Sequence, residues 1–296
     1  MADLLHQIQS ILVPFVIFIV TCAIMCFAKF CWEQKVARRK RRNPLVRKML
    51  RPAGESLRLK INKLESDWPM LFVIALILPV SSYLIAMHNS LPGHWMLSVV
   101  VFGLFAIGLE WWILRRIFTI FNELRNLYLG LEGELATAEE LNKLMLAGFR
   151  VYHDLPFEYG NIDHVVIGFC GVFAVETKAR GKGDIAEGHK VTVDLRNDGL
   201  RFAENRVKMP VDQLEINQRW LTQELSKATG LSIYVQSVLA LPGYFIEERI
   251  GSGRFKVINP VNCKSDFDDG LKRFSEEEVR RIAHQVDRLC RDIKPS

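Results

Sequence analysis

The sequence predicts an α/β protein in which three N-terminal transmembrane helices precede a mixed sheet flanked by helices. Three apolar stretches, Ile11–Phe30, Trp68–Met87 and Trp95–Leu114, each approach the roughly 20 residues that a membrane-spanning helix requires. After Gly130 no such stretch occurs, and helix-like and strand-like patterns alternate instead. A chain of 296 residues that is 49% hydrophobic is also too apolar to be disordered.

The first apolar stretch is interpreted as an uncleaved anchor, because no basic region precedes it and no small-residue cleavage pattern follows. The loop 33–67 behind it is strongly basic, so the positive-inside rule places this loop in the cytoplasm and the N-terminus outside. The third stretch returns to the cytoplasm at Arg115 and Arg116. We therefore expect a multi-pass protein of the inner (cytoplasmic) membrane, with a transmembrane region 1–116, a helical connector 117–130 and a cytoplasmic domain 131–296.

Three further features of the sequence leave alternatives open. A loop this basic also suits nucleic acid, although membrane topology and attraction to anionic lipid headgroups are favoured. Glu110, inside the third stretch, would suit a transport pathway, but it lies about one turn from Arg115, so snorkelling or a local partner is favoured. The cysteines have no paired metal-ligand spacing, and those of a cytoplasmic domain are expected to be free: Cys170, Cys263 and Cys290.

The remaining elements follow in order along the cytoplasmic part. A helix that ends near Gly148 is predicted from residue 132, separated from the connector by Gly130 and Gly133, which we expect to loosen the chain. Strands follow at 149–154, in hairpins over 160–181 and 190–202, and at 233–243 and 254–262. Helices are predicted between Pro210 and Gly230 and from Glu276 to about Cys290, the last with Ser275 and Glu278 as a capping box. This order predicts one mixed sheet flanked by helices.

The hairpin "GNIDHVVIGFCGVFAVETKARG" carries three charges among apolar residues. If it turns through Gly168–Gly171, Ile167 faces Val172 and, further along, Asp163 faces Glu176. Residues two apart on a strand share a face, so Lys178 projects from the same side of the sheet.

Opposed carboxylates repel unless a cation lies between them, and carboxylate oxygens suit Mg²⁺ or Mn²⁺. Such an ion polarises a phosphoryl oxygen and activates water, while Lys178 would orient that water or offset the charge that develops on the phosphate. The alternative is a surface pair of Lys178 and Glu176 on an edge strand, worth at most about 1 kcal/mol. It leaves Asp163 as an added repulsion, so the metal site is favoured.

Several motifs together resemble a known family: "GELATAEELNKL", "VYHDLPFEYGNIDHVVIG", "GVFAVETKARG" and "PVDQLEINQRWL". In this order they are similar to the nuclease-related domain, NERD, of the PD-(D/E)xK superfamily. The resemblance covers Gly130 to Asn262 and not the membrane segments. It implies a restriction-endonuclease-like sheet and a metal-dependent phosphodiesterase site. By motif position, the resemblance assigns catalytic roles to Glu134, Asp163, Glu176, Lys178 and Gln213, with Asp163, Glu176 and Glu134 as metal ligands.

Two features of the sequence qualify this assignment. The family's usual Asn before the Pro is replaced by Met209, which leaves the surroundings of Gln213 open. His164 follows Asp163, yet strand alternation turns it to the opposite face, so we expect a packing role, and His153 receives none.

The expected function is that of a membrane-anchored nuclease that hydrolyses phosphodiester bonds, in DNA by preference, at the cytoplasmic face, with Mg²⁺ or Mn²⁺. Defence against foreign DNA would suit this placement. The alternative is a non-catalytic module, tethered to the membrane, that binds nucleic acid or a partner. Expected partners are nucleic acid, membrane lipid, and a second copy of the chain or an activating protein. Either function would use the basic residues beside the site for phosphate contacts: Arg180, Lys182, Arg206 and Lys208.

Overall fold

The computed structural model describes residues 27, 30–31, 48–88, 95–181, 190–203, 205–261 and 263–293. The predicted first apolar stretch lies outside these residues except at Phe27 and Phe30, and the predicted phosphate contact Lys182 lies outside them too. Leu50–Ile293 forms one compact unit, to which the site described below belongs.

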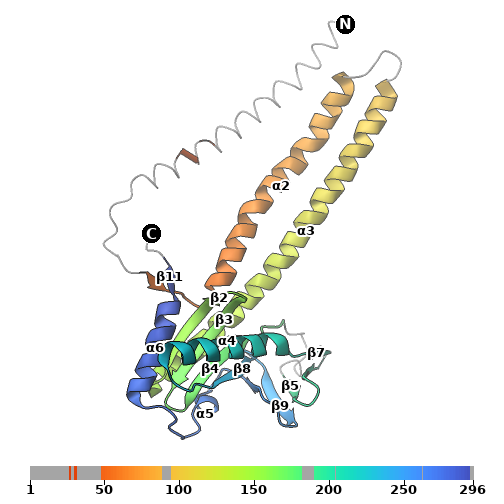
Figure 1. Ribbon diagram of the computed structural model, residues 1–296. Coiled ribbons are helices and arrows are strands. Elements are labelled where there is room, and N and C mark those ends of the chain that lie inside the picture. Colours follow the sequence, from red (N-terminus) through yellow and green to blue (C-terminus); the bar gives the residue numbers. More distant parts are fainter. Residues whose placement is uncertain are drawn as a thin grey trace. The chain divides into compact units, whose positions relative to one another are not determined.

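Two long helices, α2 (Glu55–His88) and α3 (Trp95–Asn142), lie side by side (Figure 1). They pack through two groups of apolar residues, one around Ile61 and Ile120 and one around Ala75 and Ile113. The second and third predicted apolar stretches fall within α2 and α3, respectively, and are helical as expected. Many of their other large apolar side chains are exposed, including Phe72.

The membrane prediction of three spanning helices is met in part. Among the described residues, one helix passes a test of length and hydropathy for crossing a membrane, Glu55–Ser82 within α2. The predicted third stretch opens α3, which does not pass that test over its described residues.

Helix α3 continues without a break through 117–130, the expected connector, and through Gly130 and Gly133, which we expected to interrupt it. The reason for a helical glycine at 133 is close packing rather than a turn. A Cβ added to Gly133 would lie 2.4 Å from the Cβ of Ala179, in the segment that follows the central hairpin. The paired apolar parts of α2 and α3 are called the apolar hairpin below. Helix α3 therefore joins this apolar hairpin directly to the α/β domain.

The main sheet has five strands in the order β10-β8-β4-β3-β2. β2 and β3 pair antiparallel, as do β3 and β4, whereas β4, β8 and β10 run parallel. The sheet is therefore mixed, as predicted, with β4 at its centre. Its strands are β2 (Arg150–Phe157), β3 (Gly160–Gly168), β4 (Gly171–Thr177), β8 (Val235–Ala240) and β10 (Lys256–Ile258).

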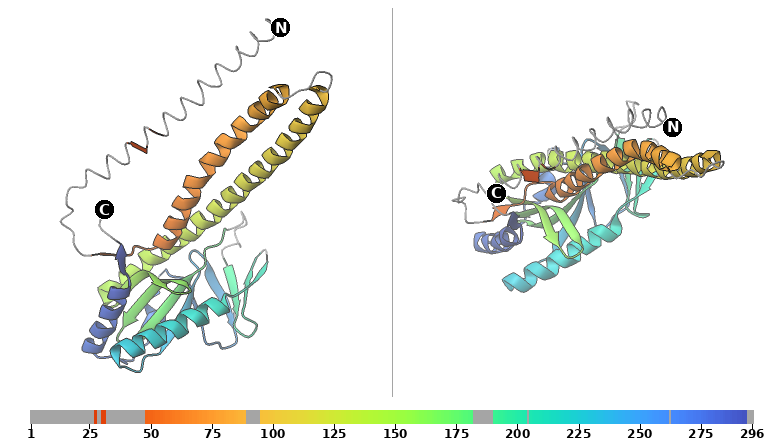
Figure 2. Two further views of the ribbon diagram at one scale, coloured as in Figure 1. Left: turned by 45° about the horizontal axis from the view of Figure 1, so that its top comes forward. Right: turned by 90° about the horizontal axis from the view of Figure 1, so that it is seen from above.

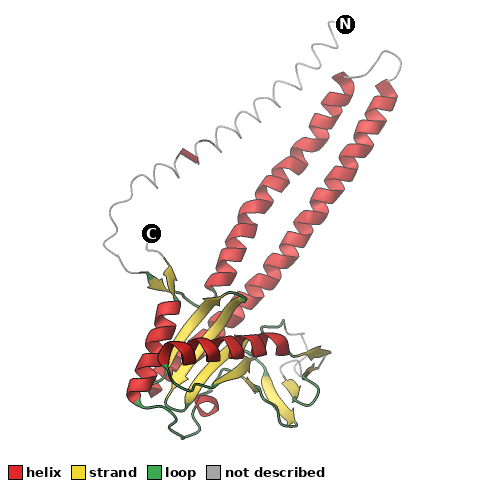
Figure 3. Ribbon diagram, in the orientation of Figure 1, coloured by secondary structure: helices red, strands yellow, loops and turns green. Residues whose placement is uncertain are grey.

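The prediction of a single sheet is wrong, because a second sheet of four strands has the order β7-β6-β5-β9 (Figure 3). The predicted hairpin around Asn197 and Gly199 is confirmed as β5 and β6. β9 was not predicted, because its polar residues alternate weakly with apolar ones and it pairs with β5 only in the folded chain. The strands are β5 (Lys190–Asp194), β6 (Gly199–Phe202), β7 (Arg206–Lys208) and β9 (Phe245–Ile250); two shorter strands, β1 (Met49–Leu50) and β11 (Arg291–Ile293), form a third sheet.

Helices cover both faces of the five-stranded sheet, as Figure 2 shows for α4 (Val211–Thr229) and α6 (Glu276–Leu289) on one face. Leu221 of α4 and Ile282 of α6 pack there against Val165 and its neighbours. On the other face, the end of α3, the 3₁₀ helix Lys143–Ala147 and α5 (Lys264–Phe267) pack against residues such as Val166. The predicted capping box at Ser275 and the predicted stop of α4 at Gly230 are both confirmed.

We predict opposite effects for alanine at two glycines of α3. Gly133→Ala should destabilise the protein by about 1 to 3 kcal/mol, because the new methyl group would overlap Ala179. Gly130→Ala is the matched control: its Cβ would meet only Leu57, at 3.4 Å, so the higher helix propensity of alanine should leave stability unchanged or raise it by up to about 1 kcal/mol. Denaturant unfolding of the full chain in detergent measures both. Equal effects at the two positions would contradict the close approach at Gly133.

Candidate functional site at the end of the central hairpin

The register of the central hairpin is the predicted one. Ile167 pairs with Val172 and Val165 with Ala174, and the ladder continues to His164 opposite Val175. The next position brings Asp163 beside Glu176, where the pairing of the two strands ends. There the backbone N–H of Thr177 donates to Asp163 Oδ2 over 2.8 Å. Both carboxylates are buried, with 5% and 2% of Asp163 and Glu176 exposed.

Lys178 lies beside Glu176 and joins it to helix α4. Its Nζ donates to Glu176 Oε1 over 2.7 Å and to Gln213 Oε1 over 3.1 Å, which places the predicted Gln213 in the site. The expected alternative, a surface ion pair on an edge strand, is wrong: β4 is the central strand and Glu176 is buried. The side chain of Lys178 remains 44% exposed, so its ammonium group is open to a ligand.

Asn217 completes this side of the site and was missed in the sequence. It is buried, and its Nδ2 donates to Glu176 Oε2 over 3.2 Å, so both oxygens of Glu176 have donors. Asn217 follows Gln213 by four residues, which puts the two on one face of α4. This spacing of four residues is the signal in the sequence that could have identified Asn217 as a site residue.

Glu134 reaches the site from α3. The close approach of Gly133 to Ala179 brings this part of α3 against the segment that carries Lys178. On its other side, Gly54 has a φ of 71°, and a Cβ there would lie 3.7 Å from Glu134 Oε2 and would overlap Leu131. Glu134 Oε2 is buried and has no hydrogen-bond partner among the described residues.

Burial raises the pKa of all three carboxyl groups, and neighbouring carboxylates raise the pKa of Glu134 and Asp163 further. Desolvation, followed by the charges of Asp154 and Glu176, raises the pKa of Glu134 to about 7. Desolvation and the charges of Glu176 and Glu134 hold the pKa of Asp163 well above its usual value. For Glu176, desolvation also raises the pKa, opposed by Lys178 and by the hydrogen bond from Asn217. The group therefore favours binding of a proton or another cation.

The predicted metal ligands come together only in part. Within the part of the chain that the structure describes, no group of three or more His, Cys, Asp and Glu side chains is arranged to hold a metal ion. Here Lys178 is the cation next to Glu176, and hydrogen bonds engage both oxygens of Asp163. The donor chemistry nevertheless fits a hard divalent cation, since three buried carboxylates lie near enough to influence one another's pKa and one oxygen of Glu134 lacks a partner among the described residues.

Three of the predicted phosphate contacts lie on or near the four-stranded sheet. The Arg180 guanidinium lies 4.6 Å from the ring centre of Phe202 and donates to Asn205 over 2.6 Å. Arg206 is exposed and pairs with Asp194 at 3.1 Å, whereas Lys208 is exposed at the end of β7. Arg180 follows Lys178 by two residues, and its contacts with Phe202 and Asn205 connect the segment after β4 to the sheet edge that carries Arg206 and Lys208; we call these three cations the basic margin.

The two histidines of the hairpin motif lie together. His153 and His164 approach through their Nδ1 atoms at 2.9 Å, and His164 Nε2 contacts the Thr177 hydroxyl at 3.2 Å. Burial lowers the pKa of His153 to about 4, and burial together with the neighbouring His153 lowers the pKa of His164 well below its usual value. The expected packing role of His164 agrees with these contacts.

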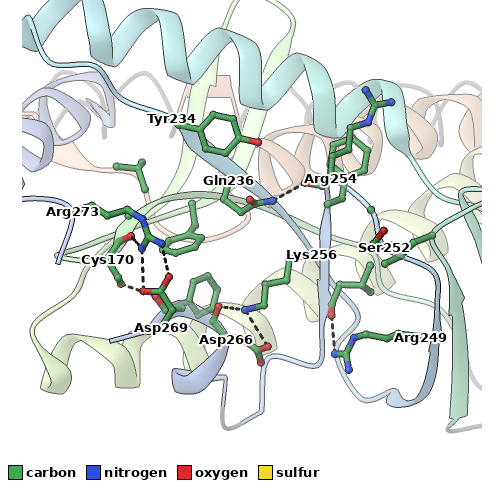
Figure 4. Close-up of a pocket in the computed structure, with 18 of the residues that line it drawn as sticks. Cys170, Tyr234, Gln236, Arg249, Ser252, Arg254, Lys256, Asp266, Asp269 and Arg273 are labelled. Atoms are coloured by element: carbon green, nitrogen blue, oxygen red, sulfur yellow. Dashed lines mark hydrogen bonds and ion pairs between the residues drawn. The ribbon is translucent and has the colours of Figure 1, made fainter. Parts of the chain in front are cut away.

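A separate cavity of about 910 Å³ lies at the other end of β4, where Gly171–Phe173 form part of its wall (Figure 4). Its basic side chains have partners of their own: Arg273 pairs with Asp269 and Lys256 with Asp266. Cys170, at its edge, is one of the cysteines that are free, as expected, together with Cys263 and Cys290. We assign the candidate site to the buried carboxylates rather than to this cavity.

The fold and the site define an α/β domain with a buried acidic centre at the end of its central hairpin. The family model of the nuclease-related domain, NERD, matches residues 129–242, so this part of the chain is similar to a nuclease-related domain. The match confirms the resemblance found in the sequence and ends before the expected limit at Asn262. No curated protein and no solved structure matches the chain.

The raised pKa of Glu134 predicts how stability depends on pH. The folded-state pKa, about 7, exceeds the ordinary value of 4.5, so the folded state loses stability as pH rises through this interval. Glu134→Gln removes this pH-dependent loss of stability, because glutamine cannot ionise. In EDTA the variant should unfold like wild type at low pH and be more stable at pH above the folded pKa, by at most about 3 kcal/mol.

Urea unfolding across the pH range tests this, with the exposed Glu132→Gln on the same helix as the control. A Glu134→Gln difference that does not change with pH would contradict the raised pKa.

Proposed function

We propose that this protein is a metal-dependent nuclease that hydrolyses phosphodiester bonds, in DNA by preference, while anchored in a membrane. The observation that carries the proposal is the group of buried carboxylates around an accessible lysine inside a nuclease-related domain: Glu134, Asp163, Glu176 and Lys178. Burial of a carboxylate is costly, because desolvation disfavours its charged form. A cluster of buried carboxylates is therefore more common at functional sites than elsewhere.

Asp163, Glu176 and Glu134 would hold Mg²⁺ or Mn²⁺ through their oxygens. When bound, such an ion polarises a phosphoryl oxygen and makes water a better nucleophile. Occupancy would also neutralise the repulsion that raises the pKa of these groups, and it would give Glu134 Oε2 the partner that it lacks.

Lys178 supplies the charge that faces the substrate. Glu176 and Gln213 hold its ammonium group by two hydrogen bonds, so its position is set before a phosphate arrives. A preorganised cation stabilises the negative charge that develops on the phosphate as the bond to the leaving oxygen breaks. Asn217 keeps Glu176 in place from the opposite side.

Cleavage assays with matched variants test the proposal. Wild type should cut plasmid or linear DNA with Mg²⁺ or Mn²⁺ and not with EDTA. Lys178→Ala should lower kcat by about 10²- to 10³-fold, because one preorganised donor is lost, and Asp163→Ala should lower it at least as much. Lys272→Ala, an exposed lysine away from the site, is the control and should cut normally.

The same assay decides between a nuclease and a non-catalytic binding module. The ion pair of Lys178 with Glu176 favours the module, since it satisfies Glu176 without a metal. DNA binding that weakens with salt, persists in Glu176→Ala and never leads to cleavage would support the module and refute the nuclease.

The membrane anchor rests on the apolar surface of α2 and α3. Exposed Phe72, Leu104 and Phe105 on these helices would face water in a soluble protein, and such surfaces mark contact with lipid or with other apolar partners. With the N-terminus outside, the nuclease-related domain would lie in the cytoplasm. There it would meet nucleic acid that arrives at the inner surface, which suits defence against foreign DNA.

We predict that the chain remains in the membrane fraction after washes with high salt and with alkaline carbonate. Leu104→Arg should reduce this fraction, because a charge at the centre of a spanning helix costs about 2.5 to 3.5 kcal/mol. Leu146→Arg, at a fully exposed position of the 3₁₀ helix, is the matched control and should leave it unchanged. Release of wild type by salt alone would refute the anchor.

A further inference from the structure

A second aspartate lies next to the catalytic one on the neighbouring strand. In the pairing of β2 with β3, His153 faces His164 and Leu155 faces Ile162, which leaves Asp154 opposite Asp163. Asp154 is fully buried and has a φ of 50°, a conformation that residues other than glycine seldom adopt. Two buried carboxylates on facing positions repel each other, so other groups must stabilise this arrangement.

The segment before helix α2 supplies the compensating charge. Arg51 Nε donates to Asp154 Oδ2 over 2.6 Å, and the backbone N–H and hydroxyl of Ser56 donate to the same oxygen over 3.1 and 3.0 Å. Arg51 is itself buried and also pairs with Asp292 at 2.7 Å. A buried aspartate with an arginine and two further donors is held in one orientation.

Asn161 connects this ion pair to the catalytic centre. Its Nδ2 donates to Asp154 Oδ1 over 2.9 Å and to Asp163 Oδ1 over 3.2 Å. Because an amide nitrogen carries two hydrogens, it can serve both carboxylates at once. The other oxygen of Asp163 accepts from the Thr177 backbone, so Asp163 is held between a donor on its own strand and one on β4.

We propose that Asn161 and Asp154 are positioning residues for Asp163, and that Arg51 and Ser56 hold them in place from the start of α2. This inference rests on the proposed function. The chain of contacts runs from Arg51 through Asp154 and Asn161 to Asp163, so the base of the apolar hairpin becomes part of the catalytic unit although it lies outside the matched residues 129–242.

The test uses the full chain in detergent and three variants. Asn161→Ala removes the bridge between the two aspartates, and Ser56→Ala removes one donor to Asp154 at the start of α2. Asn197→Ala is the matched control, since Asn197 also donates its amide to an aspartate, Asp194, over 2.9 Å in an exposed turn.

Three quantities are measured. Amide hydrogen exchange at Thr177, without metal, reports whether Asp163 still accepts its hydrogen bond. Mn²⁺ affinity, measured by calorimetry in the absence of DNA, reports whether the three carboxylates can still bind the ion. Steady-state cleavage of DNA separates kcat from KM.

For Asn161→Ala we expect at least tenfold faster exchange at Thr177 with the rest of β4 unchanged. We also expect Mn²⁺ affinity and kcat to fall by about 10- to 100-fold, with KM for DNA unchanged. Ser56→Ala should shift all three in the same direction by less, and Asn197→Ala should match wild type.

The proposal would be overturned if Asn161→Ala had the same Thr177 exchange rate, Mn²⁺ affinity and kcat as wild type. It would also be overturned if Asn161→Ala and Asn197→Ala lost Mn²⁺ affinity and kcat equally. A loss in Asn161→Ala with none in Ser56→Ala would refute the link to α2. If wild type cuts no nucleic acid, the proposed function fails, whereas the exchange at Thr177 still decides the positioning role.

Discussion

The burial of three carboxylates beside one lysine is the constraint on which the rest of this structure depends. Glu134, Asp163 and Glu176 are each desolvated, which raises all three pKa values, and neighbouring carboxylates raise those of Glu134 and Asp163 further. A carboxylate in such surroundings remains charged only where donors or cations meet it. The hydrogen bonds from Lys178, Asn217, Thr177 and Asn161 fulfil this need for Asp163 and Glu176 but not for the free oxygen of Glu134. The acidic centre therefore lowers the stability of the folded protein, because its negative charges are not fully balanced by positive ones, as is common at functional sites.

The backbone is built to bring these groups together. Antiparallel pairing of β3 with β4 places Asp163 beside Glu176, and the parallel neighbour β8 makes β4 the central strand, so both carboxylates lie in the interior. Helix α3 approaches the end of β4 closely only because Gly133 has no side chain, and this contact delivers Glu134. The site therefore combines residues from a sheet, two helices and the segment before α2. No single stretch of the chain contains it.

Local rules were sufficient to predict the hairpin register, because strand alternation and a glycine-bounded turn fix which residues face each other. They were also sufficient for helix ends at Ser275 and Gly230, where capping depends on neighbouring residues alone. They failed where tertiary contacts decide. The ion pair of Arg51 with Asp154 joins residues far apart in the chain, and it is made by an aspartate with a positive φ that the strand pattern did not predict. Gly133 resembled a helix breaker until its contact with Ala179 was known.

The continuity of α3 also bears on where the protein would act. The apolar part of the helix ends near Arg116, and the helix then rises at about 1.5 Å per residue, so Glu134 lies roughly 27 Å further along its axis. If α3 is anchored as proposed, the carboxylate is fixed to a membrane helix without a flexible linker between them. Nucleic acid would then be cut only within a few nanometres of the bilayer, whose anionic headgroups repel phosphate. The basic margin of Arg180, Arg206 and Lys208 would offset this repulsion at the site, in addition to the phosphate contacts that substrate binding needs in any setting.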